Sequence, residues 1–156
     1  MKKQFKTNSI VIKYLSVWSG VLMKDGKRSK AEKFLLHVLF VLKQISLQVK
    51  GVPGNINLIV QKAIENAMPV VSTKTLKKSG RSVQVPVLVK SKRRVRCALV
   101  WITDTARANS RFKHNLAIAF AIELIRASRG LGGAIDKKIE LHRKAYRQRA
   151  FSRGRV

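Results

Sequence analysis

The side chains in this sequence that could carry out chemistry are few and lie far apart. The three histidines, His37, His114 and His142, fall in different predicted helices or at their ends, and Cys97 is the single cysteine. No pair among them has the spacing of metal ligands, and one cysteine cannot form a disulfide within the chain. We therefore expect no metal site, and nothing indicates an oxidising compartment.

The seven acidic residues predict no general acid–base pair. Asp25 is expected in a turn and Glu32 at the start of a helix. Asp136 and Glu140 lie four residues apart near another helix start, where the helix dipole favours acidic side chains. The other three acids are expected to pair with neighbouring cations: Glu65, Asp104 and Glu123. Because no serine lies in a nucleophile-elbow pattern either, we predict that the chain is not an enzyme and has no cofactor.

One glycine-rich segment, residues 130–133, has the composition of a phosphate-binding loop. In dinucleotide-binding folds such a loop follows a strand and opens a helix. Here it follows a predicted helix, so a helix C-cap and a turn explain the glycines better.

Positive charge is the dominant chemical feature. The chain has 34 Lys and Arg against 7 Asp and Glu, a net charge of +27 in 156 residues. A compact domain with that surplus repels itself unless a polyanion neutralises it. Nucleic acid is the commonest such partner, because each phosphate offers a countercharge and releases bound ions on contact.

The cations gather in six segments of the sequence: 24–28, 77–81, 90–96, 107–113, 137–138 and 143–155. These segments fall at predicted helix ends, in loops and at the tip of a predicted hairpin. A protein that reads a DNA groove would concentrate its cations on one element. Scattered clusters favour a folded RNA, which contacts a protein on several sides.

The bulk composition predicts a folded body under this charge. An apolar fraction of 46% is enough for a core, and the length fits a single domain over residues 1–156. The longest apolar runs, 34–42 and 116–122, fall short of the roughly 20 residues that span a bilayer. We expect a basic N-terminal extension over 1–9, a basic C-terminal tail over 150–156, no membrane partner and no homo-oligomer.

The elements that must position the cations follow from periodicity and turn signals. The predicted helices cover residues 10–24, 29–50, 55–68, 92–108, 115–129 and 134–149. Ser29 with Glu32 reads as a capping box, and Asn55 as an N-cap. Alternating residues over 70–89, with a turn at 77–81, predict a hairpin in which Pro86 places the second strand at an edge. The predicted fold class is therefore mainly α, a six-helix domain with a protruding β-hairpin arm between the third and fourth helices.

Four segments, at the right spacing, resemble the small-subunit ribosomal protein seven family of bacterial and organellar type. Residues 23–32 resemble the loop between its first two helices, and residues 63–69 the end of its third helix. Residues 84–101 resemble its second hairpin strand and fourth helix, through Gln-Val-Pro-Val, a pair of arginines and a tryptophan. Residues 134–151 resemble its last helix. The resemblance covers roughly residues 15–151.

The resemblance implies a structural protein without catalysis or cofactor. Such a protein binds a multi-helix junction in the 3′ major domain of small-subunit rRNA and helps to assemble the head. Its partners are this rRNA, neighbouring head and platform proteins and, transiently, the exit-site tRNA and mRNA that the hairpin arm faces. The rRNA contacts carried over by position are Lys27, Arg28, Arg93, Arg94, Lys137, Lys138, His142 and Arg143. The cation clusters add Lys24, Arg96, Arg107 and Lys113, and the arm carries Lys77, Lys78 and Arg81.

The chain departs from the family pattern at several positions. Residues 152–156 replace an aromatic C-terminal tail, Val83 replaces a tyrosine of the hairpin, and Asp136 replaces a lysine. Such drift favours an organelle-encoded, mitochondrial member located in the ribosome, with a bacterial cytoplasmic or a plastid protein as alternatives. The charge alone would also fit a free protein that compacts nucleic acid, but that reading leaves the four similar segments unexplained.

Overall fold

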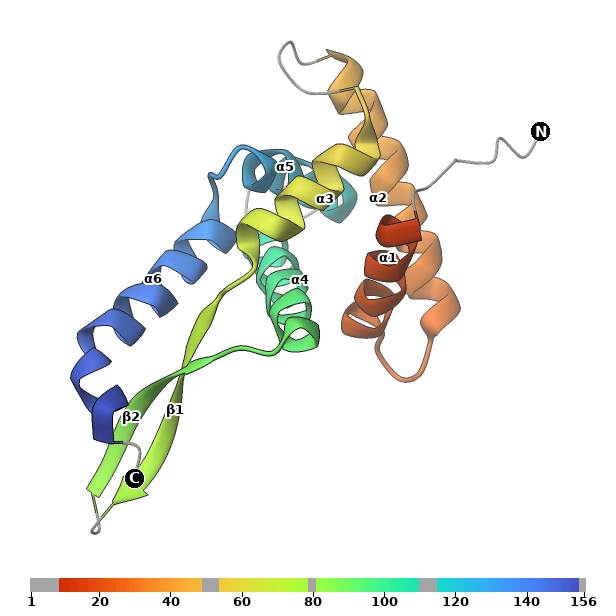
Figure 1. Ribbon diagram of the computed structural model, residues 1–156. Helices are drawn as coiled ribbons and strands as arrows, with labels where there is room; N and C mark the ends of the chain where they lie inside the picture. The colour runs from red at the N-terminus through yellow and green to blue at the C-terminus, as the bar shows by residue number, and fades with distance from the viewer. Residues whose placement is uncertain (1–8, 49–53, 79–80, 110–114, 155–156) are drawn as a thin grey trace.

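The computed structural model of the protein describes residues 9–48, 54–78, 81–109 and 115–154 (Figure 1). The elements in these ranges are α1 (Ser9–Leu22), α2 (Arg28–Gln48), α3 (Ile56–Ala67), β1 (Val71–Lys78), β2 (Arg81–Leu88), α4 (Ser91–Ala108), α5 (Leu116–Ser128), α6 (Gly133–Arg147) and a 3₁₀ helix (Arg149–Gly154). The predicted fold class is confirmed. Helices α1 to α5 form a body, from which the β1–β2 hairpin extends as an arm, with α6 lying alongside it (Figure 1).

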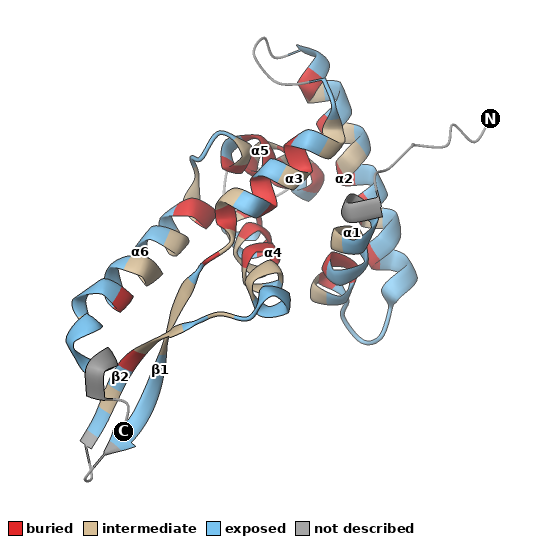
Figure 2. Cartoon of the chain, in the orientation of Figure 1, coloured by how far each residue is buried: buried red, intermediate tan, exposed pale blue. Residues whose placement is uncertain are grey.

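Helix α5, which contains the apolar run over residues 116–122, is the centre of the core. It packs against α2, α3 and α4, and Phe120 and Leu124 are fully buried (Figure 2). Trp18 of α1 is also fully buried, with its ring centroid 6.0 Å from that of Phe120. The indole Nε1 of Trp18 donates a hydrogen bond to Thr103 Oγ1 at 3.1 Å, so its polar edge is satisfied inside the core.

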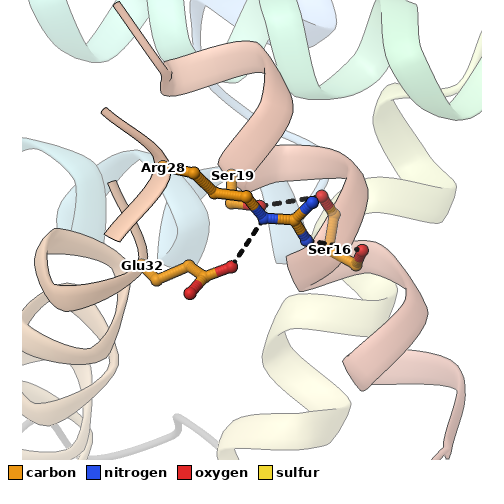
Figure 3. A network of polar contacts seen from close by, with 4 residues as sticks. All are labelled: Ser16, Ser19, Arg28 and Glu32. Carbon is orange, nitrogen blue, oxygen red and sulfur yellow. Dashed lines mark hydrogen bonds and ion pairs between the residues drawn. The ribbon is translucent and has the colours of Figure 1, made fainter. Parts of the chain in front are cut away.

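The start of α2 differs from the predicted capping box. The helix begins at Arg28, so Ser29 lies inside it, and the Glu32 carboxylate accepts a hydrogen bond from Arg28 Nε at 2.8 Å (Figure 3). Arg28 also donates to Ser16 Oγ of α1 at 3.3 Å and so joins the two helices (Figure 3). The prediction at Asn55 is confirmed, because its side chain accepts from the backbone N–H of Asn57 at the start of α3.

The hairpin pairs in an unbroken antiparallel register from Val71 opposite Leu88 to Lys78 opposite Arg81. The predicted turn over 77–81 was therefore too long, since Lys77, Lys78 and Arg81 belong to the paired strands. Pro86 lies in a ribbon whose two strands are both edges, where a missing N–H donor is tolerated.

The connection between α5 and α6 is the predicted C-cap and turn. Gly130 is left-handed, with φ 76°, and the hydrogen bonds from Leu131 N to Arg126 O and from Gly130 N to Ala127 O form a Schellman motif. Gly133, at the start of α6, lies so close to α4 that a Cβ atom there would be 2.7 Å from Thr105 Cγ2. Helix α6 can begin at this place only because residue 133 has no side chain.

Three acids were expected to pair with cations, and the structure confirms one of them. Asp104 lies 3.8 Å from Lys137 Nζ. Glu65 instead accepts a hydrogen bond from Gln61 Nε2. Glu123 is buried and accepts from the backbone N–H of Ala134 at 3.1 Å. The sequence could not predict that bond, because the partner is an unpaired N–H group at the start of another helix.

Burial raises the pKa of Glu123 above 4.5, although the hydrogen bond from Ala134 and the charge of Arg126 act in the opposite direction. The folded protein therefore holds a proton on Glu123 more tightly than the unfolded chain does. Its contribution to stability is greatest at low pH and declines as the pH rises above 4.5.

We expect Glu123→Gln to preserve the free energy of unfolding at pH 7, because the amide oxygen can still accept from Ala134 without a buried charge. Glu123→Ala leaves that N–H unpaired and should cost about 1–3 kcal/mol. Urea unfolding followed by circular dichroism between pH 4.5 and 7 measures both. As the pH rises, the free energy of unfolding of the wild type should fall relative to that of Glu123→Gln. The same pH dependence in the wild type and in Glu123→Gln would contradict this account.

Candidate nucleic-acid interface

Three of the predicted RNA contacts come together at one surface hollow of about 260 Å³. Lys24 and Lys27 line it from the connection between α1 and α2, and Arg107 lines it from the last turn of α4. Lys30, in the first turns of α2, lines the same hollow. We call these four residues the hollow cluster. Phe34 and Leu116 are among the apolar residues between them, so the hollow has a charged rim and an apolar floor.

A tight turn sets the position of the two loop lysines. Asp25 and Gly26 both have positive φ, 51° and 69°, and Lys27 N bonds Lys24 O at 3.0 Å. Two consecutive positive φ angles characterise a type I′ turn, for which Asp-Gly is a favoured sequence. Lys24 and Lys27 are the first and last residues of this turn and so lie close together. Of the lining residues only Asp25 offers an opposing charge, 3.7 Å from Lys27.

Lys30 was not among the predicted contacts. Its signal was present, since it lies two residues beyond the basic segment 24–28. Lys113 lies outside the described residues.

Three other predicted contacts lie where the arm leaves the body. Arg94 Nε donates to Pro69 O at 3.0 Å, and Lys138 Nζ donates to Asn66 O at 2.6 Å. His142 Nε2 accepts from the backbone N–H of Val70 at 3.1 Å. We call Arg94, Lys138 and His142 the arm-root trio. All three are half-buried, and each already has a partner within the protein.

The electrostatics of the arm-root trio follow from this crowding. Burial lowers the pKa of Lys138, and the charge of Arg94 lowers it further. Burial also lowers the pKa of His142 below 6.5, with the charge of Lys138 as a second cause. A histidine that accepts at Nε2 must be neutral and carry its proton on Nδ1. The lowered pKa of His142 therefore favours the neutral form that this hydrogen bond needs.

The remaining predicted contacts are spread over the surface. Arg93 and Arg96 are exposed in the first turns of α4, and Arg143 is exposed on α6. Lys137 is partly engaged by Asp104, and Arg28 by Glu32 and Ser16. On the arm, Lys77 is exposed, and Lys78 and Arg81 end the paired strands.

Ion pairs within the protein leave most of the charge uncompensated. Exposed acids pair locally, as Glu140 does with Lys144 at 2.7 Å and Asp25 with Lys27. Even if each acid in the chain neutralised one cation, the surplus would remain +27. The surface therefore needs an extended polyanion rather than a single anionic ligand.

The part of the chain that the structure describes shows no metal site and no membrane-spanning helix. No three His, Cys, Asp or Glu side chains there are grouped so that they could hold a metal ion. None of the described helices combines the length and the apolar character that crossing a bilayer requires.

Comparison with known proteins gives a consistent result. The family model for "Ribosomal protein S7p/S5e" matches residues 3–149. The small ribosomal subunit protein uS7 of Neisseria meningitidis is 37% identical over 139 residues, which cover 88% of this chain and 83% of the relative. The uS7 proteins of Stenotrophomonas maltophilia and Xanthomonas euvesicatoria are 37% and 38% identical over 133 residues, 85% of this chain and 80% of each relative. These relatives are bacterial, and a mitochondrial origin stays a prediction.

Proposed function

The chain belongs to the ribosomal protein S7p/S5e family, and we propose that its role in the small ribosomal subunit is to bind the 3′ major domain of the rRNA and help assemble the head. This family is structural and non-enzymatic. The observation that carries the proposal is the hollow cluster. Its cations converge from the α1–α2 turn, from α2 and from α4, on a surface with a net positive charge. Cations on separate elements suit an RNA junction better than a single groove.

The same proposal gives the arm a separate partner. The β1–β2 hairpin extends beyond the body (Figure 1), and Lys77, Lys78 and Arg81 lie at its end. Cations on a projecting ribbon can reach phosphates that the body cannot contact. We therefore assign the arm to the exit-site tRNA and the mRNA path, and the rest of the surface to rRNA and to neighbouring head and platform proteins.

Crosslinking in intact ribosomes tests the role in the subunit. The protein, carrying an affinity tag, is crosslinked by ultraviolet light in purified ribosomes, and the attached nucleotides are sequenced. We expect nucleotides of the 3′ major domain of small-subunit rRNA. Crosslinks to large-subunit rRNA, or recovery of the protein outside ribosomes, would overturn the proposal.

Filter binding distinguishes an rRNA-binding protein from one that compacts nucleic acid. The full chain is titrated with a transcript of the 3′ major domain of a bacterial small-subunit rRNA and, as a control, with duplex DNA of equal length. We expect clearly tighter binding to the transcript at equal salt. Equal affinity for the two would favour the alternative of a free nucleic-acid-compacting protein.

The arm allows a further prediction. Replacing Lys77, Lys78 and Arg81 together with glutamine should leave affinity for the rRNA transcript nearly unchanged but weaken exit-site tRNA occupancy roughly threefold or more, the effect of losing a few exposed charge contacts. Occupancy is measured with labelled deacylated tRNA on reconstituted ribosomes. Loss of head assembly in this variant would show that the arm does not act separately from the body.

A further inference from the structure

The arm-root trio holds the segment of chain that leads from the body into the arm. Its three partners, Asn66 O, Pro69 O and Val70 N, lie between the end of α3 and the start of β1. The Asn66 side chain also donates to Ala127 O and Ser128 O at the end of α5, at 3.0 and 3.1 Å. Residues 66–70 are therefore tied to α4, α5 and α6 at once.

The bonds of the arm-root trio satisfy backbone groups that have no partner in a regular helix or strand. Asn66 O lies in the last turn of α3, where carbonyl groups lack helical partners and attract a cation. Pro69 has no N–H to donate, so its carbonyl and the next N–H are the groups that can fix the chain direction at this point. Besides the trio, this segment is held by the Asn66 bonds to α5, by the cap bonds of Met68 N at the end of α3 and by the bond from Val89 N to Val70 O. Among these, only the last lies on the arm side of Pro69.

A second contact between α6 and the hairpin lies farther along the arm. Gln148 Nε2 donates to Gln84 Oε1 at 3.1 Å. Val85 of β2 and Ala145 of α6 are both buried, although the arm has few buried residues (Figure 2). The hairpin is thus attached at two separated places, at the arm root by α6 and farther out by Gln148, the residue that follows α6. Helix α6 and the arm are therefore joined along their length.

We infer that Arg94, Lys138 and His142 are positioning residues, which set the direction of the arm relative to the body and do not themselves bind RNA. Adjacent residues on α6 differ in what their side chains contact. Lys138 and His142 face the arm root, whereas Arg143 next to His142 is exposed to solvent and Lys137 next to Lys138 is turned toward Asp104 of α4. Only the effect on bound RNA rests on the proposed function, because the direction of the arm is a property of the isolated protein.

The chemistry of His142 separates the two roles. An RNA phosphate needs a donor and is bound best by a cation, whereas the Val70 N–H needs a neutral ring that accepts. His142 makes the second kind of contact. Glutamine at this position could still accept through its side-chain oxygen, whereas phenylalanine keeps the ring volume without an acceptor.

Distance measurements between spin labels test the inference directly. In a Cys97→Ala background, nitroxides are attached at cysteines replacing Lys77 on the arm and Lys62 on α3, both exposed. The change tested is Lys138→Met combined with His142→Phe. We expect the label-to-label distance distribution to broaden about twofold, because locally ordered segments open when few contacts hold them. When His142→Gln replaces His142→Phe beside Lys138→Met, the width of the distance distribution should return toward that of the wild type. Circular dichroism checks that each variant is folded.

Binding to the rRNA transcript supplies the second readout, with Arg143→Gln as the matched control. This variant removes one positive charge from α6, as Lys138→Met does, because His142 is neutral. A contact with a phosphate contributes about one unit to the slope of log affinity against log salt. The Lys138 and His142 changes should leave that slope unaltered, whereas the control should reduce it without broadening the distance distribution. The inference would be overturned if Lys138→Met combined with His142→Phe left the distance distribution unbroadened, or if it reduced the slope of log affinity against log salt. If the wild type fails to bind the transcript, the proposed function fails while the distance result still decides the role of the trio.

If the double variant does not fold, Arg94→Lys replaces it in both measurements. Lysine keeps the charge for a phosphate but loses the guanidinium geometry that reaches Pro69 O. A broadened distribution with an unaltered salt slope supports positioning, and the reverse result overturns it.

Discussion

Replacing Lys24, Lys27 and Arg107 together with glutamine should weaken binding to the rRNA transcript roughly 100-fold at 0.1 M salt, with the loss shrinking toward 1 M. The slope of log affinity against log salt should fall by about three, one unit for each phosphate contact removed. All three side chains are exposed and line the same hollow, so one RNA segment can meet them together. Filter binding over a series of salt concentrations measures both quantities.

The matched control removes the same charge from elsewhere on the body. Lys13, Lys33 and Lys62 are exposed on α1, α2 and α3 and do not line the hollow. Their replacement with glutamine should cost far less affinity at equal salt. If both triple variants lose the same amount, net charge rather than the hollow cluster determines binding.

Trp18→Ala should lower the free energy of unfolding by about 3–5 kcal/mol, a large part of the stability of a domain of this size. The side chain is fully buried, packs against Phe120 and donates its indole N–H to Thr103. Its removal leaves a large cavity between α1 and the rest of the body. Urea unfolding measures the change in the free energy of unfolding. It is followed by far-ultraviolet circular dichroism, which reports helix content and does not depend on the removed tryptophan.

Trp18→Phe separates packing from the hydrogen bond. Phenylalanine keeps most of the apolar volume but has no N–H, and Thr103 can still donate its hydroxyl to Leu99 O. We expect a loss of about 1 kcal/mol, the typical net contribution of a single hydrogen bond. A loss as large as that of alanine would mean that the bond to Thr103, not the packing of the ring, dominates.

The order of elements was predictable because its signals are local. The capping asparagine at position 55, the proline at 69 and the alternation over 70–89 each act within a few residues of the boundary that they define. The capping box at Ser29 failed for a local reason too. The Asp25-Gly26 turn already directs the chain into α2 at Arg28, and Glu32 is then used by the Arg28 side chain.

The site was predictable in its chemistry but not in its geometry. Composition alone indicated a nucleic-acid partner, and the resemblance together with the cation clusters indicated which cations to consider. That Lys24 and Arg107 meet at one hollow depends on how α1, α2 and α4 pack, which no sequence spacing reports. The role of the arm-root trio was hidden for another reason, since its partners are backbone atoms, and these look the same at every position of a sequence.

Gly133 has a consequence for the whole molecule. At this point α6 lies so close to α4 that a single methyl group would collide with Thr105. The 15 residues of α6 extend about 22 Å beyond it, along the hairpin. A methyl group at residue 133 would push the start of α6 away from α4, and α6 would shift against the hairpin that it contacts farther along. The placement of α6 beside the hairpin therefore depends on the absence of a side chain at one residue, at the opposite end of α6 from Gln148 and its bond to Gln84.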